Sequence, residues 1–143
     1  MYVKSSLGST FVYLNSRNNS FKIKLLAESY ELGVYMKVIK IKLEYGCFPV
    51  WIYGENSELI GNDLPPYLIG DSDIDSKFVH IQEVYDSLYL DDGKEFKYIG
   101  FKKIEKKENF FIELFSAINL LESKLDDEYS MEDNKTFLLN SIV

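Results

Sequence analysis

The sequence predicts an α+β fold in which two amphipathic helices pack on one face of an antiparallel sheet. Residues 36–68 contain two strand-like runs and a third that returns after a turn, which is typical of an antiparallel meander. Apolar residues then recur at helical spacing over 74–90 and again over 109–125. The expected order from Met36 is therefore β-β-β-α-β-α.

The three strands of the meander each have a recognisable pattern. Residues 39–45 alternate apolar with charged side chains, so one strand face is oily and the other is charged. Residues 47–53 form the second strand and contain the only Cys and the only Trp of the chain. Gly and Asn in 54–57 favour a reversal. Residues 58–60 then return antiparallel, and the following prolines end the sheet because proline has no N–H for a ladder.

A helix of about 16 residues is predicted to follow and to end near Leu90. Its apolar stripe consists of Ile74, Phe78, Ile81, Tyr85 and Leu88. Asp71 and Asp73 precede the stripe, and acidic residues there favour a helix N-terminus. A turn at 91–93 leads into a predicted strand over 95–101, with Phe96 and Tyr98 on one face.

The C-terminal part begins with a charged connection at 102–107 and continues as the strongest helix signal of the chain. Over 109–125 the apolar positions are Phe111, Leu114, Phe115, Ile118, Leu121 and Leu125. The tail over 129–143 is ambiguous, since 136–139 suits either a last strand or a docking helix.

Residues 1–35 form a poorly patterned extension to the single domain expected at 36–143. Short strands at 11–14 and 21–26 are one interpretation of this segment. The other is that translation starts at Met36 and that the extension is not native, because codons for 32–34 suit a ribosome-binding site.

Charge is unevenly distributed along the chain, whose net charge is −7. Residues 1–35 hold four basic and two acidic side chains, so residues 36–143 carry 12 basic and 21 acidic ones. A domain with a net charge of −9 repels nucleic acid and anionic membranes and attracts basic proteins, so neither of the first two is an expected partner. Solubility alone is an equally good explanation of the charge.

The composition predicts a soluble, cytoplasmic protein. Hydrophobic residues make up 46% of the chain, which suits a folded globule. A single cysteine cannot form an internal disulfide. The sequence contains no apolar run long enough to span a bilayer and no apolar segment typical of a signal peptide.

Catalytic motifs are absent from the sequence. His80 is the only histidine, which excludes a His-paired nucleophile and a multi-histidine metal site, and we expect it at the boundary of the first helix or facing solvent. Cys47 is expected as a small core residue in a buried strand. A calcium loop at 71–82 is rejected, because Ser76 and Gln82 replace the required Gly and Glu. We predict no catalytic residue, cofactor or metal.

The remaining signal is an acidic strip beside the aromatic sheet. Its carboxylates are Asp71, Asp73, Asp75, Glu83, Asp86, Asp91, Asp92 and Glu95. Such a strip suits electrostatic capture of a basic partner. Trp51, Tyr53 and Tyr67 are candidate anchors, and we favour a core position for Trp51.

Residues 36–125, from KVIKIKLEYGCFPVWIYGENSELIGNDLPPYL through IQEVYDSLYLDDGKEFKYIGF to the last amphipathic helix, resemble small bacterial immunity proteins. These are the antitoxins encoded beside polymorphic or contact-dependent toxins. The resemblance implies a non-enzymatic cytoplasmic inhibitor that occludes a toxin domain, often a basic nuclease, with an acidic surface.

The expected function is therefore tight binding to a cognate toxin protein, without an indication of the oligomeric state. Two alternatives from other classes stay open. One is a small hydrolase with a buried Asp or Glu pair, which requires a cleft lined by desolvated carboxylates. The other is a structural or regulatory subunit of a larger bacterial assembly, for which an exposed apolar patch should dominate the surface.

Overall fold

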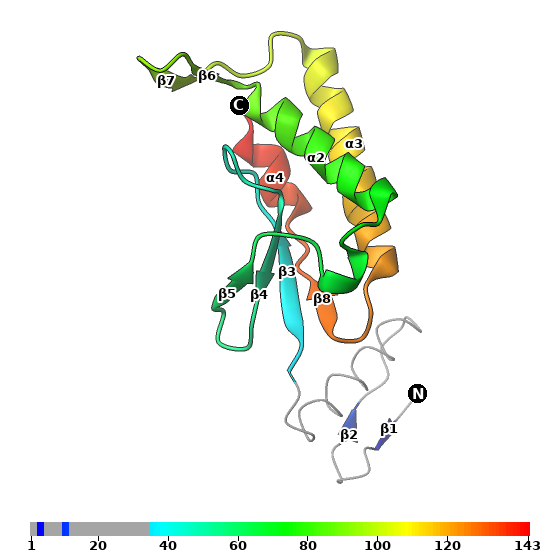
Figure 1. The fold of residues 1–143 in the computed structure, drawn as a ribbon. Helices are drawn as coiled ribbons and strands as arrows, with labels where there is room; N and C mark the ends of the chain where they lie inside the picture. The colour runs from blue at the N-terminus through cyan, green and yellow to red at the C-terminus, as the bar shows by residue number, and fades with distance from the viewer. Residues whose placement is uncertain (1–2, 5–9, 12–34) are drawn as a thin grey trace.

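The structure, a computed structural model, describes residues 3–4, 10–11 and 35–143 (Figure 1). The elements in chain order are β1 (Val3–Lys4), β2 (Thr10–Phe11), β3 (Lys37–Ile41), β4 (Val50–Tyr53), β5 (Leu59–Gly61), the 3₁₀ helix η1 (Pro66–Leu68), α2 (Ser72–Asp86), β6 (Tyr89–Asp91), β7 (Phe96–Tyr98), α3 (Ile104–Lys124), β8 (Tyr129–Met131) and α4 (Lys135–Ser141). The predicted α+β class is confirmed.

The main sheet has the strand order β5-β4-β3-β8. The predicted antiparallel meander is present, because β3 pairs with β4 and β4 with β5 in antiparallel register. The fourth strand comes from the C-terminal tail and pairs with β3 in parallel, so the sheet is mixed (Figure 1). A parallel partner requires a long crossover, and here α2 and α3 lie within that crossover.

The two faces of the sheet differ as the alternation in 39–45 predicts. Ile39 lies opposite Ile52 and Ile41 opposite Val50, and all four side chains are buried. They share one core with the buried residues of α2, α3 and α4, so the helices cover this face. Lys40, Lys42, Trp51 and Tyr53 alternate with those residues and therefore lie on the opposite face.

Helix α2 begins as predicted, because the Asp71 side chain accepts hydrogen bonds from the N–H groups of Asp73 and Ile74. Such a cap satisfies N–H groups that have no partner within the helix. The helix ends at Asp86, earlier than the predicted Leu90. The chain then enters β6 at Tyr89, and the strand requires an extended backbone there.

Strand β7 forms within the predicted 95–101 region but does not join the main sheet. It pairs with β6 in a separate antiparallel hairpin, with Tyr89 opposite Tyr98 and Asp91 opposite Phe96. Figure 1 shows this hairpin projecting beyond the end of α2. The prediction did not anticipate β6, since its residues continued the helical stripe.

Helix α3 runs alongside α2 and begins at Ile104, whereas the prediction placed its start at residue 109. The charged connection predicted over 102–107 is thus largely helical, because Lys and Glu favour helix even where the apolar stripe is missing. Of the two alternatives for 136–139, the helix is correct, because these residues lie within α4. The strand β8 forms earlier in the tail, where no strand was predicted.

The structure also differs from the sequence expectations at Cys47 and at the start of β4. Cys47 is half-buried in the turn between β3 and β4, where its N–H donates to the Glu44 carbonyl, so its predicted place in a buried strand is wrong. Strand β4 begins at Val50 and not at the predicted residue 47, because Pro49 lacks the N–H that a ladder needs. Of the strands expected at 11–14 and 21–26, Phe11 lies in β2, and 12–14 and 21–26 lie outside the described residues.

Candidate functional site

The eight carboxylates of the predicted acidic strip occupy two separate places. Asp71, Asp73 and Asp75 lie at the start of α2, whereas Asp91, Asp92 and Glu95 belong to the β6–β7 hairpin beyond its end. Glu83 and Asp86 lie in the last turns of α2. Since a helix of 15 residues is about 22 Å long, the strip consists of two distant groups.

At the start of α2 the least exposed carboxylate, that of Asp71, already has partners within the protein. Besides capping the helix, Asp71 accepts a 2.6 Å bond from the Lys124 ammonium. That bond is the main cause that holds the pKa of Asp71 below its ordinary value, so the carboxylate stays ionised. Asp73 and Asp75 are exposed in the first turn, where negative side chains interact favourably with the helix dipole and stabilise the helix.

Tyr67 is also placed at this end of the molecule. Its hydroxyl accepts the N–H of Asp126 at 2.8 Å, and its ring packs against the buried Tyr129 with centroids 5.9 Å apart. The side chain is 46% exposed, so its edge remains accessible. Tyr67 therefore connects η1 to the start of β8, far from the hairpin acids.

At the other end of α2, aromatic rings gather around Tyr89. The ring of Phe96 stacks on that of Tyr89 at 5.1 Å with an interplanar angle of 4°. Tyr45, Tyr85 and Tyr98 approach the same ring edge-on at 5.3, 5.5 and 5.3 Å. The rings come from the β3–β4 connection, α2, β6 and β7, so the cluster joins the hairpin to the body of the domain.

Hydrogen bonds from backbone N–H groups to carboxylate side chains hold this cluster in place. The Gly46 N–H donates to the Asp86 carboxylate at 2.9 Å, which fixes the β3–β4 connection against the end of α2. The Asp92 side chain accepts the N–H groups of Lys94 and Glu95, both at 2.9 Å, and these bonds lower its pKa. Gly93, with φ of +81°, provides the left-handed residue of the turn. The hairpin is therefore pre-formed.

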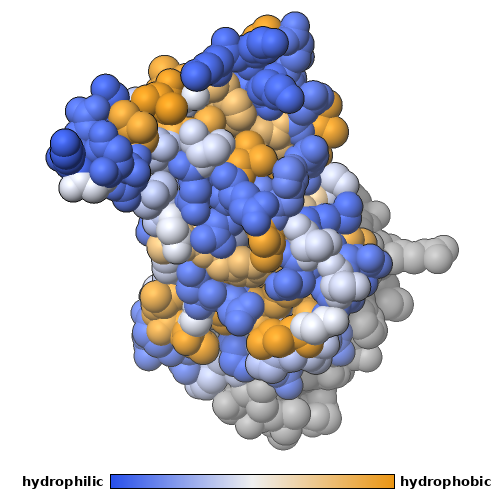
Figure 2. All heavy atoms as spheres, turned by 45° about the horizontal axis from the view of Figure 1, so that its top comes forward, coloured by the Kyte–Doolittle hydropathy of each residue, from blue (hydrophilic) through white to orange (hydrophobic). Residues whose placement is uncertain are grey.

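Several rings of the cluster are exposed beside the carboxylates. Phe96 is 54% exposed, Tyr45 40% and Tyr98 39%. The pKa of Tyr45 is raised first by desolvation and then by the nearby charges of Asp91 and Asp86. We call the following residues the acid–aromatic patch: Tyr45, Asp86, Tyr89, Asp91, Asp92, Glu95, Phe96 and Tyr98. Figure 2 shows hydrophilic and hydrophobic side chains side by side on the projecting part of the molecule at its upper left.

The acids of this patch were predicted from the sequence, as was a shared face for Phe96 and Tyr98, whereas Tyr45, Tyr85 and Tyr89 were not predicted as their neighbours. The available signal was the spacing of Tyr85 and Tyr89 at i and i+4, where side chains of one helix would meet. Here the chain leaves the helix between them, and their hydroxyls still lie 2.9 Å apart. Burial and this bond raise the pKa of Tyr85.

The sheet face opposite the helices carries a second cluster. Trp51 is half-buried there, so its predicted core position is wrong: residue 51 lies one position out of phase with the buried Val50 and Ile52. The Lys42 ammonium donates to the Tyr53 hydroxyl at 2.6 Å and lies 5.6 Å from the centre of the Trp51 ring. Lys40 lies 4.8 Å from the Tyr53 ring and pairs with Glu132. These lysines are thus engaged within the sheet.

His80 is exposed on α2 and pairs with Glu113 of α3 at 3.1 Å, which agrees with its predicted boundary position. Every carboxylate in residues 35–143 is at least partly exposed, and Asp71 and Asp86 are the only two of them that are half-buried. The same part of the chain contains no group of three or more His, Cys, Asp or Glu side chains arranged to hold a metal ion.

The comparisons with known proteins add no relative: no family model matches the chain, and no curated protein or solved structure matches it at a significant level. Within the described ranges, none of the helices has both the length and the apolar character needed to cross a membrane.

Proposed function

We propose that this chain is a non-enzymatic bacterial immunity protein that neutralises a basic toxin domain, such as a nuclease, by binding it through the acid–aromatic patch. The observation that supports this most is the position of the exposed Tyr45 ring, within the aromatic cluster, close to the carboxylates of Asp91 and Asp86. We place the activity in the cytoplasm, in keeping with the resemblance of residues 36–125 to such inhibitors.

The chemistry of the patch suits a lysine or arginine side chain of a partner. Phe96, Tyr45 and Tyr98 offer exposed ring area on which the stem and charge of such a residue can pack. Asp91 and Asp86 provide the opposite charge close to the Tyr45 ring. Aromatic anchors slow dissociation, while the negative charge of the domain accelerates encounter with a basic partner.

The hydrogen bonds that hold the hairpin add to this argument. A binding loop that is ordered before association loses little conformational entropy on binding. The Ile99 N–H donates to the Leu88 carbonyl at 2.7 Å, and the Tyr98 hydroxyl donates to the Val143 carbonyl at 3.1 Å. These bonds fix the base of the hairpin, so the patch is presented without rearrangement.

The exposure of the carboxylates favours binding over hydrolysis. An acid–base pair of carboxylates needs at least one member with a pKa raised by desolvation. In residues 35–143 no carboxylate is buried, and the ammonium of Lys124 keeps the half-buried Asp71 ionised. A hydrolase is therefore the weaker proposal for this part of the chain.

A growth-rescue experiment tests the proposal. The C-terminal domain encoded by the adjacent gene is expressed in a bacterium with and without this chain. We expect the domain alone to arrest growth, and this chain to restore growth and to co-purify with the domain at one to one. A harmless neighbour, or one whose toxicity this chain leaves unchanged, would overturn the immunity proposal.

A pair of variants with equal charge tests the patch itself. The hairpin variant carries Asp91→Asn, Asp92→Asn and Glu95→Gln, and the helix variant carries Asp73→Asn, Asp75→Asn and Glu83→Gln. Both remove three negative charges, and Asn at 92 can still accept the two backbone bonds. Rescue should fail at lower toxin expression for the hairpin variant than for the helix variant. Equal failure would remove the patch from the proposal.

A further inference from the structure

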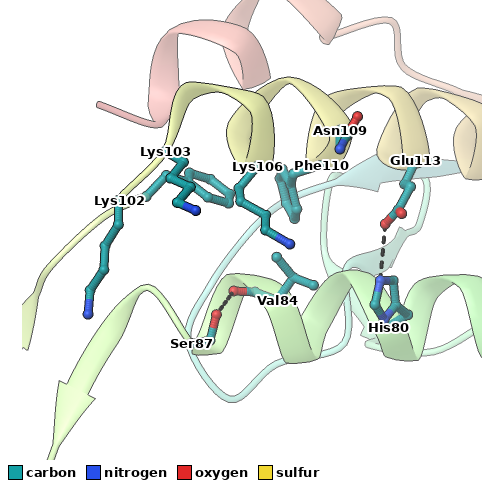
Figure 3. Close-up of a pocket in the computed structure, with 10 residues that line it drawn as sticks. His80, Val84, Ser87, Lys102, Lys103, Lys106, Asn109, Phe110 and Glu113 are labelled. Carbon is teal, nitrogen blue, oxygen red and sulfur yellow. Dashed lines mark hydrogen bonds and ion pairs between the residues drawn. The ribbon is translucent and has the colours of Figure 1, made fainter.

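A groove of about 500 Å³ lies between α2 and the first half of α3 (Figure 3). From α2 it is lined by His80, Val84 and the adjoining Ser87, and from α3 and the segment before it by Phe101, Lys102, Lys103, Lys106, Asn109, Phe110 and Glu113. The volume is within the range of about 300–1,000 Å³ that is usual for small-molecule sites. None of these residues belongs to the acid–aromatic patch.

The base of the groove is apolar. Phe110 is 2% exposed, and the ring centre of the half-buried Phe101 lies 5.6 Å from its ring centre. Val84 faces them from α2 and packs against the same core (Figure 3). An apolar chain of a ligand could therefore be removed from water against this base.

One end of the groove is strongly cationic. Lys102, Lys103 and Lys106 are exposed along it, and none of the three forms an ion pair within the described part of the chain (Figure 3). Further along the groove the His80–Glu113 pair connects the two helices at 3.1 Å. The groove thus offers ammonium groups at one end and an apolar base beside them.

The positive charge of these lysines does not stabilise the start of α3 through the helix dipole. Positive charge at a helix N-terminus opposes the helix dipole. Lys103 is the N-cap residue and makes no side-chain capping bond. Local rules of this kind are most often broken at functional sites. Three lysines along one groove are also unlike the overall net charge of the chain, which is −7.

We propose that the groove binds a small amphipathic anion, with its carboxylate or phosphate head on Lys102, Lys103 and Lys106 and its apolar body on Val84, Phe101 and Phe110. A lysine ammonium is a point charge that binds either a carboxylate or a phosphate. The experiment below therefore distinguishes the two kinds of head group. The site is independent of the proposed toxin binding, because it lies on other residues and needs no protein partner.

The test is a titration of the full chain with decanoate, decyl phosphate and inorganic phosphate at fixed pH and ionic strength, each below its micelle concentration. His80 is the only histidine of the chain and lines the groove, so its imidazole proton resonances report occupancy without further assignment. We expect saturable shifts with one or both decyl anions and much weaker ones with inorganic phosphate. Absence of saturable shifts with both decyl anions would overturn the proposal, and equal binding of inorganic phosphate would remove its apolar part.

Two variants with the same change in charge locate the site. The groove variant carries Lys102→Gln, Lys103→Gln and Lys106→Gln, and the control carries Lys77→Gln, Lys94→Gln and Lys107→Gln, none of which lines the groove. The groove variant should bind the decyl anion about tenfold more weakly, as expected from the loss of a few exposed charge pairs, and the control should keep its affinity. Equal weakening in both variants would show unspecific attraction and overturn the site.

A third variant tests the apolar part without changing charge. Asn109→Trp places a larger side chain at an exposed position that lines the groove. We expect it to abolish binding of the decyl anion while the melting temperature stays the same. Undiminished binding would contradict an apolar body lying between the two helices.

Discussion

The two ends of helix α2 carry similar numbers of carboxylates in different surroundings. At the start, the Asp71 carboxylate forms an ion pair with Lys124 and caps the helix. The neighbouring acids Asp73 and Asp75 lie exposed in the first turn. At the end, Asp86 and the hairpin residue Asp91 lie beside a cluster of partly exposed aromatic rings. The difference teaches that a run of acidic residues does not define a binding site. The groups packed beside each carboxylate decide what its charge can do.

Removing an aromatic anchor should have the largest effect on binding. Phe96→Ala deletes the exposed ring that stacks on Tyr89, and we expect toxin affinity to fall about thirtyfold or more, as at an interface hot spot. Calorimetric titration measures the change. Phe137→Ala is the matched control, because Phe137 is similarly exposed on α4. If both variants lose the same affinity, the comparison between the two ends of α2 fails.

Removing the hairpin charges should have the next largest effect. In the variant with Asp91→Asn, Asp92→Asn and Glu95→Gln, we expect the association rate at low salt to fall about tenfold, since steering depends on charge near the interface. Stopped-flow mixing at several salt concentrations measures the rate and its salt dependence. The helix variant defined above should lose less. A larger loss in the helix variant would move the binding surface to the exposed acids along α2.

Changes at the start of α2 should instead affect stability. Asp71→Ala removes both the helix cap and the partner of Lys124, so we expect the melting temperature to fall by about 3–6 °C. Toxin affinity should stay within a factor of about two, because the site is not an anchor. Asp75→Ala, which changes an exposed acid in the same turn, is the control and should lower the melting temperature less.

The smallest expected effect is a dependence on pH. The pKa of Asp71 is lower in the folded chain than its ordinary value of 3.8, chiefly because Lys124 donates to the carboxylate. Its ionised form therefore stabilises the fold above pH 3.8, and this contribution is lost as the pH falls through the lower folded value. Asp71→Asn keeps an acceptor for the cap, so the difference in melting temperature from the wild type should shrink steadily below pH 4. A difference that is constant down to pH 2.5 would contradict the ion pair.

Local patterns predicted most of the fold. Alternation in 39–45 identified the buried face of β3, and the spacing of Ile74, Phe78 and Ile81 identified the buried face of α2. The Asp71 cap was also visible, since acidic residues before a helical stripe indicate its first turn. These features depend on neighbours within a few residues, which is why one sequence is enough to find them.

Features that depend on distant residues were not predictable. Tyr129 pairs with β3 in parallel, and no short pattern in a three-residue strand indicates which strand it will join. The predicted stripe continued to Leu88, beyond the true end of α2 at Asp86, because Leu88 is buried although it lies outside the helix. The acids of the acid–aromatic patch were therefore visible in the sequence, but their aromatic neighbours required the three-dimensional arrangement.

Hydrogen exchange of the chain, alone and bound to the toxin that it rescues, tests the central claim most directly. We expect binding to slow exchange of backbone amides in the β6–β7 hairpin, over residues 89–98, and at the β3–β4 connection around Gly46. Amides in the first turn of α2, over residues 72–76, should be unchanged. Protection at that first turn, or on the sheet face that carries Trp51 and Tyr53, with an unprotected hairpin would contradict the acid–aromatic patch as the binding surface.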